Sequence, residues 1–173
     1  MSTPCTSPET KRPEAPPSLR PARPEDAAEL SRIALGAKAA LGYAPQLIGR
    51  WRAELTIDAR IIREHLVWAA CLKDGRIAGF FCLVLCGGGA RLEHLWVATD
   101  CQRQGIGSLL MDKAWALAIE CRAGAVSIDA EPQAEAFYLR QGFHRVAEVA
   151  APIPGSPQRM RPQMLRLRAA GGA

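Results

Sequence analysis

The chain has 173 residues, of which 49% are hydrophobic and 23% charged, and its formal net charge is +5 at pH 7. This size and balance suit one globular domain, and no stretch stays apolar over the roughly 18 residues that a membrane span requires. The six cysteines are scattered without Cys-x-x-Cys spacing, so neither a metal site nor a disulfide framework is expected.

The two ends of the chain differ in composition from its middle. Residues 1–18 are rich in Pro, Ser, Thr and Glu and have little apolar surface, so we expect them to form a disordered tail. Residues 19–168 are expected to form a single domain and residues 169–173 a flexible C-terminus. The start has no apolar segment typical of an export signal, which makes the cytoplasm the expected location.

Basic residues gather modestly near the far end of the chain, at Arg159, Arg161, Arg166 and Arg168. No aromatic residues are interleaved with them, so a solvated face is expected there rather than a nucleic-acid site. The sequence therefore predicts no nucleic-acid partner and no membrane partner. Its positive balance also suits a small ligand that carries several phosphates.

Helix signals dominate the first part of the chain. Residues 19–22 resemble a short edge strand, and the segment 24–41 then begins with a proline and two acidic residues, as helices often do. A second helix is expected at about 46–55, where Pro45 allows a new start. One more short helical segment is expected within 56–64, with Asp58 available as its cap.

The middle of the chain predicts three consecutive antiparallel strands. The strongly apolar run 66–72 and the segment 76–86 flank Asp74-Gly75, the two-residue signal of a tight hairpin. The second of these strands has large apolar residues on both faces, which indicates burial on both sides. Three glycines then turn the chain into a third strand at 90–97.

The remainder of the chain alternates between helix and strand. A helix at 105–122 and a strand at 125–129 complete a strand–helix–strand unit, which should be right-handed and parallel. A helix at about 133–141 leads to a strand at 143–149. The alternating segment 163–168 predicts a half-solvated last strand.

The loop before the 105–122 helix carries Gly105 and Gly107 in the first helical turn. A helix start leaves backbone N–H groups without partners, and glycine lets an anion approach them closely. A P-loop would need Gly-Lys followed by Ser or Thr, whereas Ile106 and Ser108 follow these glycines. A dinucleotide fingerprint would need a small residue where Leu110 stands. The segment therefore predicts a phosphate site of another kind.

The segment Gln102-Arg103-Gln104-Gly105-Ile106-Gly107 resembles the Gln/Arg-x-x-Gly-x-Gly/Ala motif of the GNAT superfamily of N-acetyltransferases. The preceding Leu95-Trp96-Val97 is similar to the strand that binds pantetheine in that superfamily, and Ala136 to Phe143 is similar to its tyrosine-bearing helix and Gly-Phe strand entry. The resemblance implies an α/β (α+β) fold: a GNAT-like mixed, mostly antiparallel central sheet with helices on both faces and a splayed parallel strand pair.

The resemblance also implies acetyl-CoA as co-substrate. Backbone groups of the strand would bind the pantetheine arm, and the amides of the glycine loop would hold the pyrophosphate. The expected cofactor-binding residues are Leu95, Trp96, Val97, Gln102, Arg103, Gln104, Gly105, Ile106, Gly107 and Ser108.

Two residues are expected to handle protons. Tyr138 occupies the position of the tyrosine that protonates the departing thiolate in this superfamily. The acceptor amine must first lose a proton, because an ammonium has no lone pair and a lysine-like amine has a pKa near ~10.4. Glu93 is the nearest carboxylate on the third strand, and simple alternation puts it on the face of the pantetheine-binding residues. A strand bulge would exchange the faces, so His94 remains an alternative base, as do Asp129 and Glu131.

The acceptor site has no general sequence code. The segment 37–43 is expected to line it, with Tyr43 as a substrate-binding residue. The sequence thus predicts an N-acetyltransferase that moves an acetyl group from acetyl-CoA to an unidentified primary amine of a small molecule or protein by direct attack. The alternative is a non-catalytic acyl-CoA-binding sensor or interaction module. Many members of the family dimerise, which leaves a homodimer open.

Overall fold

The computed structural model describes residues 16–169 of the chain. Its helices and strands are β1 (Ser18–Pro21), α1 (Ala27–Ala39), α2 (Pro45–Arg50), α3 (Ala59–Glu64), β2 (Leu66–Cys71), β3 (Ile77–Cys86), β4 (Gly89–Val97), α4 (Ile106–Glu120), β5 (Ala125–Asp129), α5 (Glu135–Arg140), β6 (His144–Ala150) and β7 (Met160–Leu167). Within residues 16–169, no helix is long and apolar enough to cross a membrane.

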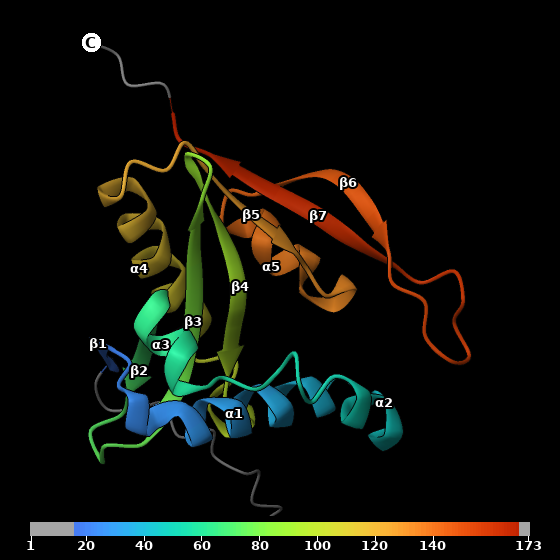
Figure 1. Cartoon of the computed structure of the whole chain (residues 1–173), viewed down its shortest axis with the longest axis horizontal. Helices are drawn as coiled ribbons and strands as arrows, with labels where there is room; N and C mark the ends of the chain where they lie inside the picture. The colour runs from blue at the N-terminus through green and yellow to red at the C-terminus, as the bar shows by residue number, and fades with distance from the viewer. Residues whose placement is uncertain (1–15, 170–173) are drawn as a thin grey trace, which may run out of the picture.

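Seven strands form one mixed sheet in the order β1-β2-β3-β4-β5-β7-β6 (Figure 1). Every neighbouring pair is antiparallel except β4 and β5, which are parallel and are connected through α4. The Asp74-Gly75 hairpin is present, with Gly75 at φ 86°, in the left-handed region that glycine adopts without strain. The predicted fold class is therefore confirmed, and so is the parallel strand–helix–strand unit.

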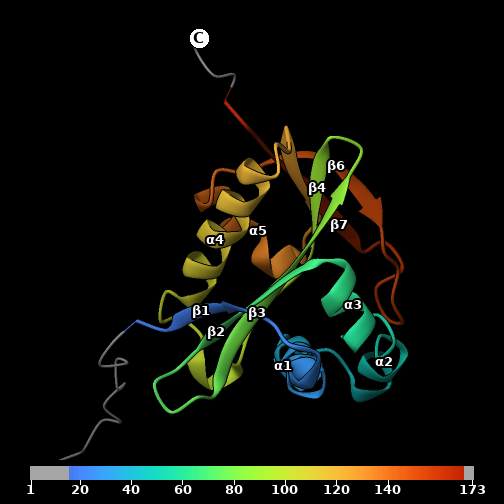
Figure 2. The ribbon, with the colours of Figure 1, turned by 60° about the vertical axis from the view of Figure 1, so that its left-hand side comes forward.

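The sheet separates two groups of helices. Figure 2 shows α4 and α5 on one side of strands β2 to β4, and α1 and α3 on the other. Neighbouring residues of β3 pack in opposite directions: Phe81 joins the apolar cluster under α4, and Phe80 joins the cluster under α1, each with no exposed surface. The prediction that this strand is buried on both faces is confirmed.

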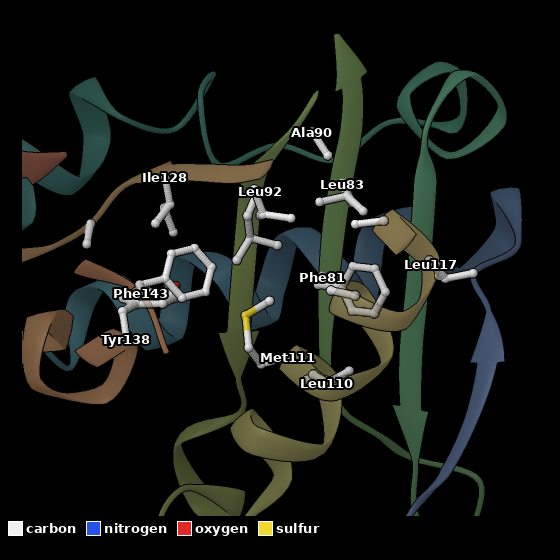
Figure 3. Close-up of a cluster of buried hydrophobic side chains, with 14 of the residues drawn as sticks. Phe81, Leu83, Ala90, Leu92, Leu110, Met111, Leu117, Ile128, Tyr138 and Phe143 are labelled. Atoms are coloured by element: carbon white, nitrogen blue, oxygen red, sulfur yellow. The ribbon is translucent and has the colours of Figure 1, made fainter. Parts of the chain in front are cut away.

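The α4-side cluster extends to the far half of the sheet. Figure 3 shows Tyr138 and Phe143 packed beside Ile128 of β5, at the end of the cluster away from Phe81. A tyrosine of α5 is thus held by the same apolar cluster that anchors α4 to the sheet. This packing fixes α5 next to the gap between β4 and β5.

Several predicted boundaries differ from the structure, three of them as follows. Helix α2 ends at Arg50, and residues 51–55 form turns instead of continuing the helix. Strand β1 begins at Ser18, the last residue assigned to the tail, while residues 1–15 and 170–173 lie outside the described part of the chain. Strand β7 begins at Met160 and lies between β5 and β6, although it contains Pro162.

Helix α3 depends on a side-chain cap at its start. The Asp58 carboxylate accepts a hydrogen bond from the backbone N–H of Ile61 at 2.8 Å, as its predicted capping role requires. Replacing Asp58 with alanine is expected to lower the free energy of unfolding by about 1 kcal/mol, because the helix N–H loses its partner. Urea denaturation measures the change. Glu64→Ala, which removes only an exposed pair with Arg60 in the same helix, is the control and should cost clearly less.

Candidate active site

Strands β4 and β5 form a wedge. They pair only near their starts, Ala90 with Val126 and Arg91 with Ser127, and then diverge. A cleft of about 770 Å³ lies along the diverging strands, lined by residues 92–97 of β4 and 128–131 at the end of β5. It runs from the start of α4, at Gly107, to α1 and the residues after α2. One cleft therefore joins the glycine loop to the predicted acceptor side.

The loop before α4 has an unusual backbone. Gly105 is the N-cap of α4 with φ 82°, and Arg103 also has a positive φ of 63°. Gln102 ties the loop back to the sheet, because its side-chain amide donates to the carbonyl oxygen of Val97 at 3.2 Å. Gln104 closes the loop on itself by donating to the carbonyl of Asp100 at 3.2 Å. These contacts set the direction in which the first amides of α4 face.

The first turn of α4 offers free backbone donors. Within the described residues, the N–H groups of Ile106, Gly107 and Ser108 form no hydrogen bond with other protein groups. A Cβ on Gly107 would lie 3.4 Å from the ring of Phe137, an ordinary van der Waals contact, so the helix start packs closely against α5 there. The side chain of Ile106 is buried, and only its backbone can serve a ligand. Open amides at the positive end of a helix are suited to bind a phosphate group.

Tyr138 reaches the cleft from α5. Its ring is 4% exposed and packs edge-on against Phe137 and Phe143, with ring centroids 5.0 and 5.5 Å apart. In the described part of the chain its hydroxyl has no hydrogen-bond partner. Every side-chain oxygen there that is fully buried does have a partner, so the Tyr138 hydroxyl is not fully buried. Because the residue lines the cleft, the hydroxyl opens to it. Burial raises the pKa of Tyr138, which keeps the phenol protonated.

Glu93 lies at a bulge. Leu92 pairs with Leu83 of β3 and His94 with Cys82, which leaves Glu93 as an extra residue without a partner on β3. The simple alternation used to predict its face is therefore interrupted. The Glu93 carboxylate is 41% exposed, lines the cleft and accepts a hydrogen bond from Nε of Arg91 at 2.6 Å.

His94 lines the cleft as a hydrogen-bond donor. Burial lowers its pKa, so the imidazole is neutral at pH 7. The indole N–H of Trp96 donates to Nδ1 of His94 at 3.2 Å, which places the single imidazole hydrogen on Nε2. This arrangement leaves His94 without a free basic nitrogen, which weighs against the alternative that it is the general base.

The two other candidate bases are fully engaged. Burial opposes ionisation of Asp129, but hydrogen bonds from Arg91 and Gln163 lower its pKa. For Glu131, burial is likewise outweighed by hydrogen bonds from Lys38 and Tyr43, which lower the pKa of this carboxyl. Carboxylates held by such donors are weak proton acceptors, so Glu93 is the candidate carboxylate with the most free surface. Glu54, which follows α2, also lines the cleft and is exposed.

Tyr43 and Arg159 have surroundings that differ from those expected. Tyr43 is not among the residues that line the cleft; its hydroxyl donates to Glu131 at 2.7 Å, and its ring packs edge-on against Trp51, which does line it. The side chain of Arg159 is 9% exposed and bonded to Glu131 at 2.8 Å. The prediction that Arg159 belongs to a solvated face is wrong, because its charge is buried against a carboxylate from another part of the chain.

The splayed parallel pair, the glycine loop at a helix start and the buried tyrosine beside the cleft together define a GNAT-type acyltransferase. A model of the acetyltransferase (GNAT) domain matches residues 50–151, which is more than half of the chain. The chain therefore belongs to the GNAT acetyltransferase family.

Solved structures share this architecture. A GCN5-related N-acetyltransferase from Rhodopseudomonas palustris superposes with a TM-score of 0.73 at 24% identity, over 89% of this chain and 97% of that one. The PaiA N-acetyltransferase from Thermoplasma acidophilum, solved in complex with coenzyme A, gives 0.70 at 19% identity, over 87% and 98%. The ribosomal-protein-S18-alanine N-acetyltransferase from Escherichia coli gives 0.68 at 17% identity, over 90% and 96%. At these identities the similarity shows a common fold.

Proposed function

We propose that this protein transfers the acetyl group of acetyl-CoA to a primary amine of a small molecule or protein by direct attack. The observation that carries the proposal is the single cleft in which open amides of the α4 start, unpaired backbone of β4 and the Tyr138 hydroxyl meet. This combination provides an anion site, an edge for amide pairing and a proton donor in one continuous space.

The cofactor-binding residues fit a phosphate-bearing thioester. When bound, acetyl-CoA supplies an activated carbonyl carbon and a sulfur that leaves as a thiolate. The backbone of Leu95, Trp96 and Val97 faces the wedge without β5 partners and would pair with the pantetheine amides. The amides of residues 103–108 would hold the pyrophosphate, with the Arg103 side chain lining the same end of the cleft.

Glu93 and Tyr138, which both line the cleft, would transfer the protons. Glu93 would take the proton of the incoming ammonium, directly or through one water, because it is the exposed carboxylate on the diverging strand β4. Tyr138 would donate a hydrogen bond to the departing sulfur. Since burial raises the pKa of Tyr138, the phenol stays protonated at the pH values where an amine begins to lose its proton.

Two measurements on the full chain test the proposal. Calorimetric titration with acetyl-CoA should give micromolar-range affinity, and release of free thiol in the presence of an amine panel should show turnover. Binding without turnover of any amine would favour the alternative, a non-catalytic acyl-CoA sensor. Absence of binding would refute both readings, because both require the α4 start to hold the cofactor.

The variant Glu93→Gln tests the role of Glu93 as the base independently of acetyl-CoA binding. We expect kcat/KM to fall about 10- to 100-fold near neutral pH, with the affinity for acetyl-CoA unchanged, because the amide keeps the size of the side chain but cannot accept a proton. The loss should shrink as the pH rises toward the pKa of the acceptor amine, since less proton removal is then required. A loss that stays constant with pH would show that Glu93 does not act as the base.

A further inference from the structure

A buried ion cluster closes the acceptor end of the cleft. The Glu131 carboxylate, just after β5, accepts hydrogen bonds from Lys38 of α1, from the Tyr43 hydroxyl at 2.7 Å and from Nη2 of Arg159 at 2.8 Å. The side chains of Lys38, Glu131 and Arg159 are only 8–9% exposed. Trp51 packs on the cluster, with its ring centroid 4.2 Å from Nζ of Lys38.

The cluster holds more positive than negative charge. Lys38 and Arg159 share the single carboxylate of Glu131, and Nε of Arg161 lies 3.9 Å from the same group. Burial and the charges of Arg161 and Arg159 lower the pKa of Lys38, against the opposing effect of Glu131. Burying a cation without an equal anion is costly, so the cluster is suited to receive a second anion.

Two of these cations face the cleft with donors to spare. Lys38 and Arg161 line the cleft, whereas Arg159 does not. The Lys38 ammonium has three N–H groups, and in residues 16–169 it donates a hydrogen bond only to Glu131. Arg161 uses Nη2 on the carbonyl of Asp129 and Nε on that of Ala130, and its Nη1 has no acceptor within the same residues. A carboxylate in the cleft could bond to both side chains.

The neighbouring wall has the opposite polarity. Glu93 and Asp129 share one cation, Arg91, at 2.6 and 2.8 Å, so this group carries an excess negative charge. Asp129 and Glu131 are two residues apart on the chain, a spacing of about 7 Å if it is extended. The positive and negative groups therefore lie close together on one wall of the cleft.

We propose that the acceptor is a small zwitterionic amine, an amino acid or close analogue, whose carboxylate binds Lys38 and Arg161 while its amine faces Glu93. This inference rests on the proposed acetyltransferase function and narrows the acceptor to one chemical class. An amine on a protein, or a plain polyamine, has no carboxylate beside the reacting nitrogen and would leave the buried positive charge unmatched.

Matched substrate pairs test the inference. Thiol release by the full chain is measured with acetyl-CoA and each of the common amino acids, and again with the amide of each amino acid, which keeps the amine and the side chain but lacks the carboxylate. We expect kcat/KM for at least one amino acid to exceed that of its amide about 10-fold or more. Amides or polyamines that react as well as the best amino acid would overturn the inference and leave the acetyltransferase function standing. No turnover of any amine would overturn both.

Two variants locate the carboxylate site. In Arg161→Gln, and separately in Lys38→Met, KM for the preferred amino acid should rise about 10- to 100-fold, while KM for its amide stays the same. Lys38→Met leaves Glu131 paired with Arg159 and lowers the buried charge, so it should fold even if Arg161→Gln does not. Arg63→Gln, on α3 and outside the cleft, is the control. Equal increases in KM for acid and amide would show that the cations only support the fold.

Discussion

Replacing Tyr138 with phenylalanine is expected to lower kcat by about 100-fold or more while the protein remains folded. The hydroxyl has no partner in the described structure and opens to the cleft, so its loss removes a proton donor without breaking a protein hydrogen bond. The ring stays in place, because Phe137 and Phe143 pack on either side of it. Thiol release measures kcat, and thermal unfolding measures stability.

A packing variant serves as the control for Tyr138→Phe. Phe143→Leu removes ring contact with Tyr138 but lies outside the cleft, so it should reduce stability more than turnover. If both variants lost turnover equally, the hydroxyl would have no chemical role. The raised pKa of Tyr138 adds a second expectation: the phenol stays protonated as the pH rises, so it should cause no loss of activity near its ordinary value of about 10.

The second large effect is expected at the glycine loop. Gly105→Trp should weaken acetyl-CoA binding about 100-fold. The bulky side chain should cost two charge-assisted hydrogen bonds between the backbone and the phosphates, and a loss of about 1.5 kcal/mol for each bond corresponds to that change in affinity. Gly105 has φ 82°, a conformation that costs another residue about 1–2 kcal/mol. No atom lies within 4 Å of a Cβ built there, so the indole has room next to the start of α4, where it should obstruct a phosphate group.

Gly155→Trp is the matched control. Gly155 has φ 80° and equally free surroundings, but it lies in the loop between β6 and β7. Both variants should lose similar stability, and only Gly105→Trp should lose affinity in calorimetric titration. Unchanged affinity in Gly105→Trp would mean that the start of α4 does not hold the phosphates.

Much of the fold could be predicted because its signals are local. The hairpin follows from Asp74-Gly75, and the parallel pair follows from a strand, a glycine-opened helix and a strand in succession. The place of β7 could not be predicted in this way. Pro162 lacks an N–H group and normally marks an edge or a strand end, yet in β7 it pairs with Glu148 of β6, and its carbonyl accepts a hydrogen bond at 2.9 Å from Ala130, just after β5.

The two ends of the cleft also differ in how far local sequence signals predict them. The proposed cofactor residues from Gln102 to Ser108 form one continuous segment, and their motif can be recognised from the sequence alone. The acceptor end is assembled by tertiary contacts: Glu131 is 93 positions from Lys38 and 28 from Arg159. Nothing local distinguishes these residues from surface charges, because only the folded chain brings them together and excludes water from them.

The divergence of β4 from β5 creates a strand edge in the interior of the molecule. On an outer strand, unpaired amides can recruit any extended chain and so promote aggregation. Here helices lie on both faces of the sheet (Figure 2), and the edge faces the cleft between the two diverging strands. A slender linear molecule with amide groups can enter it, and once there it would act as a temporary strand that joins the two halves of the sheet.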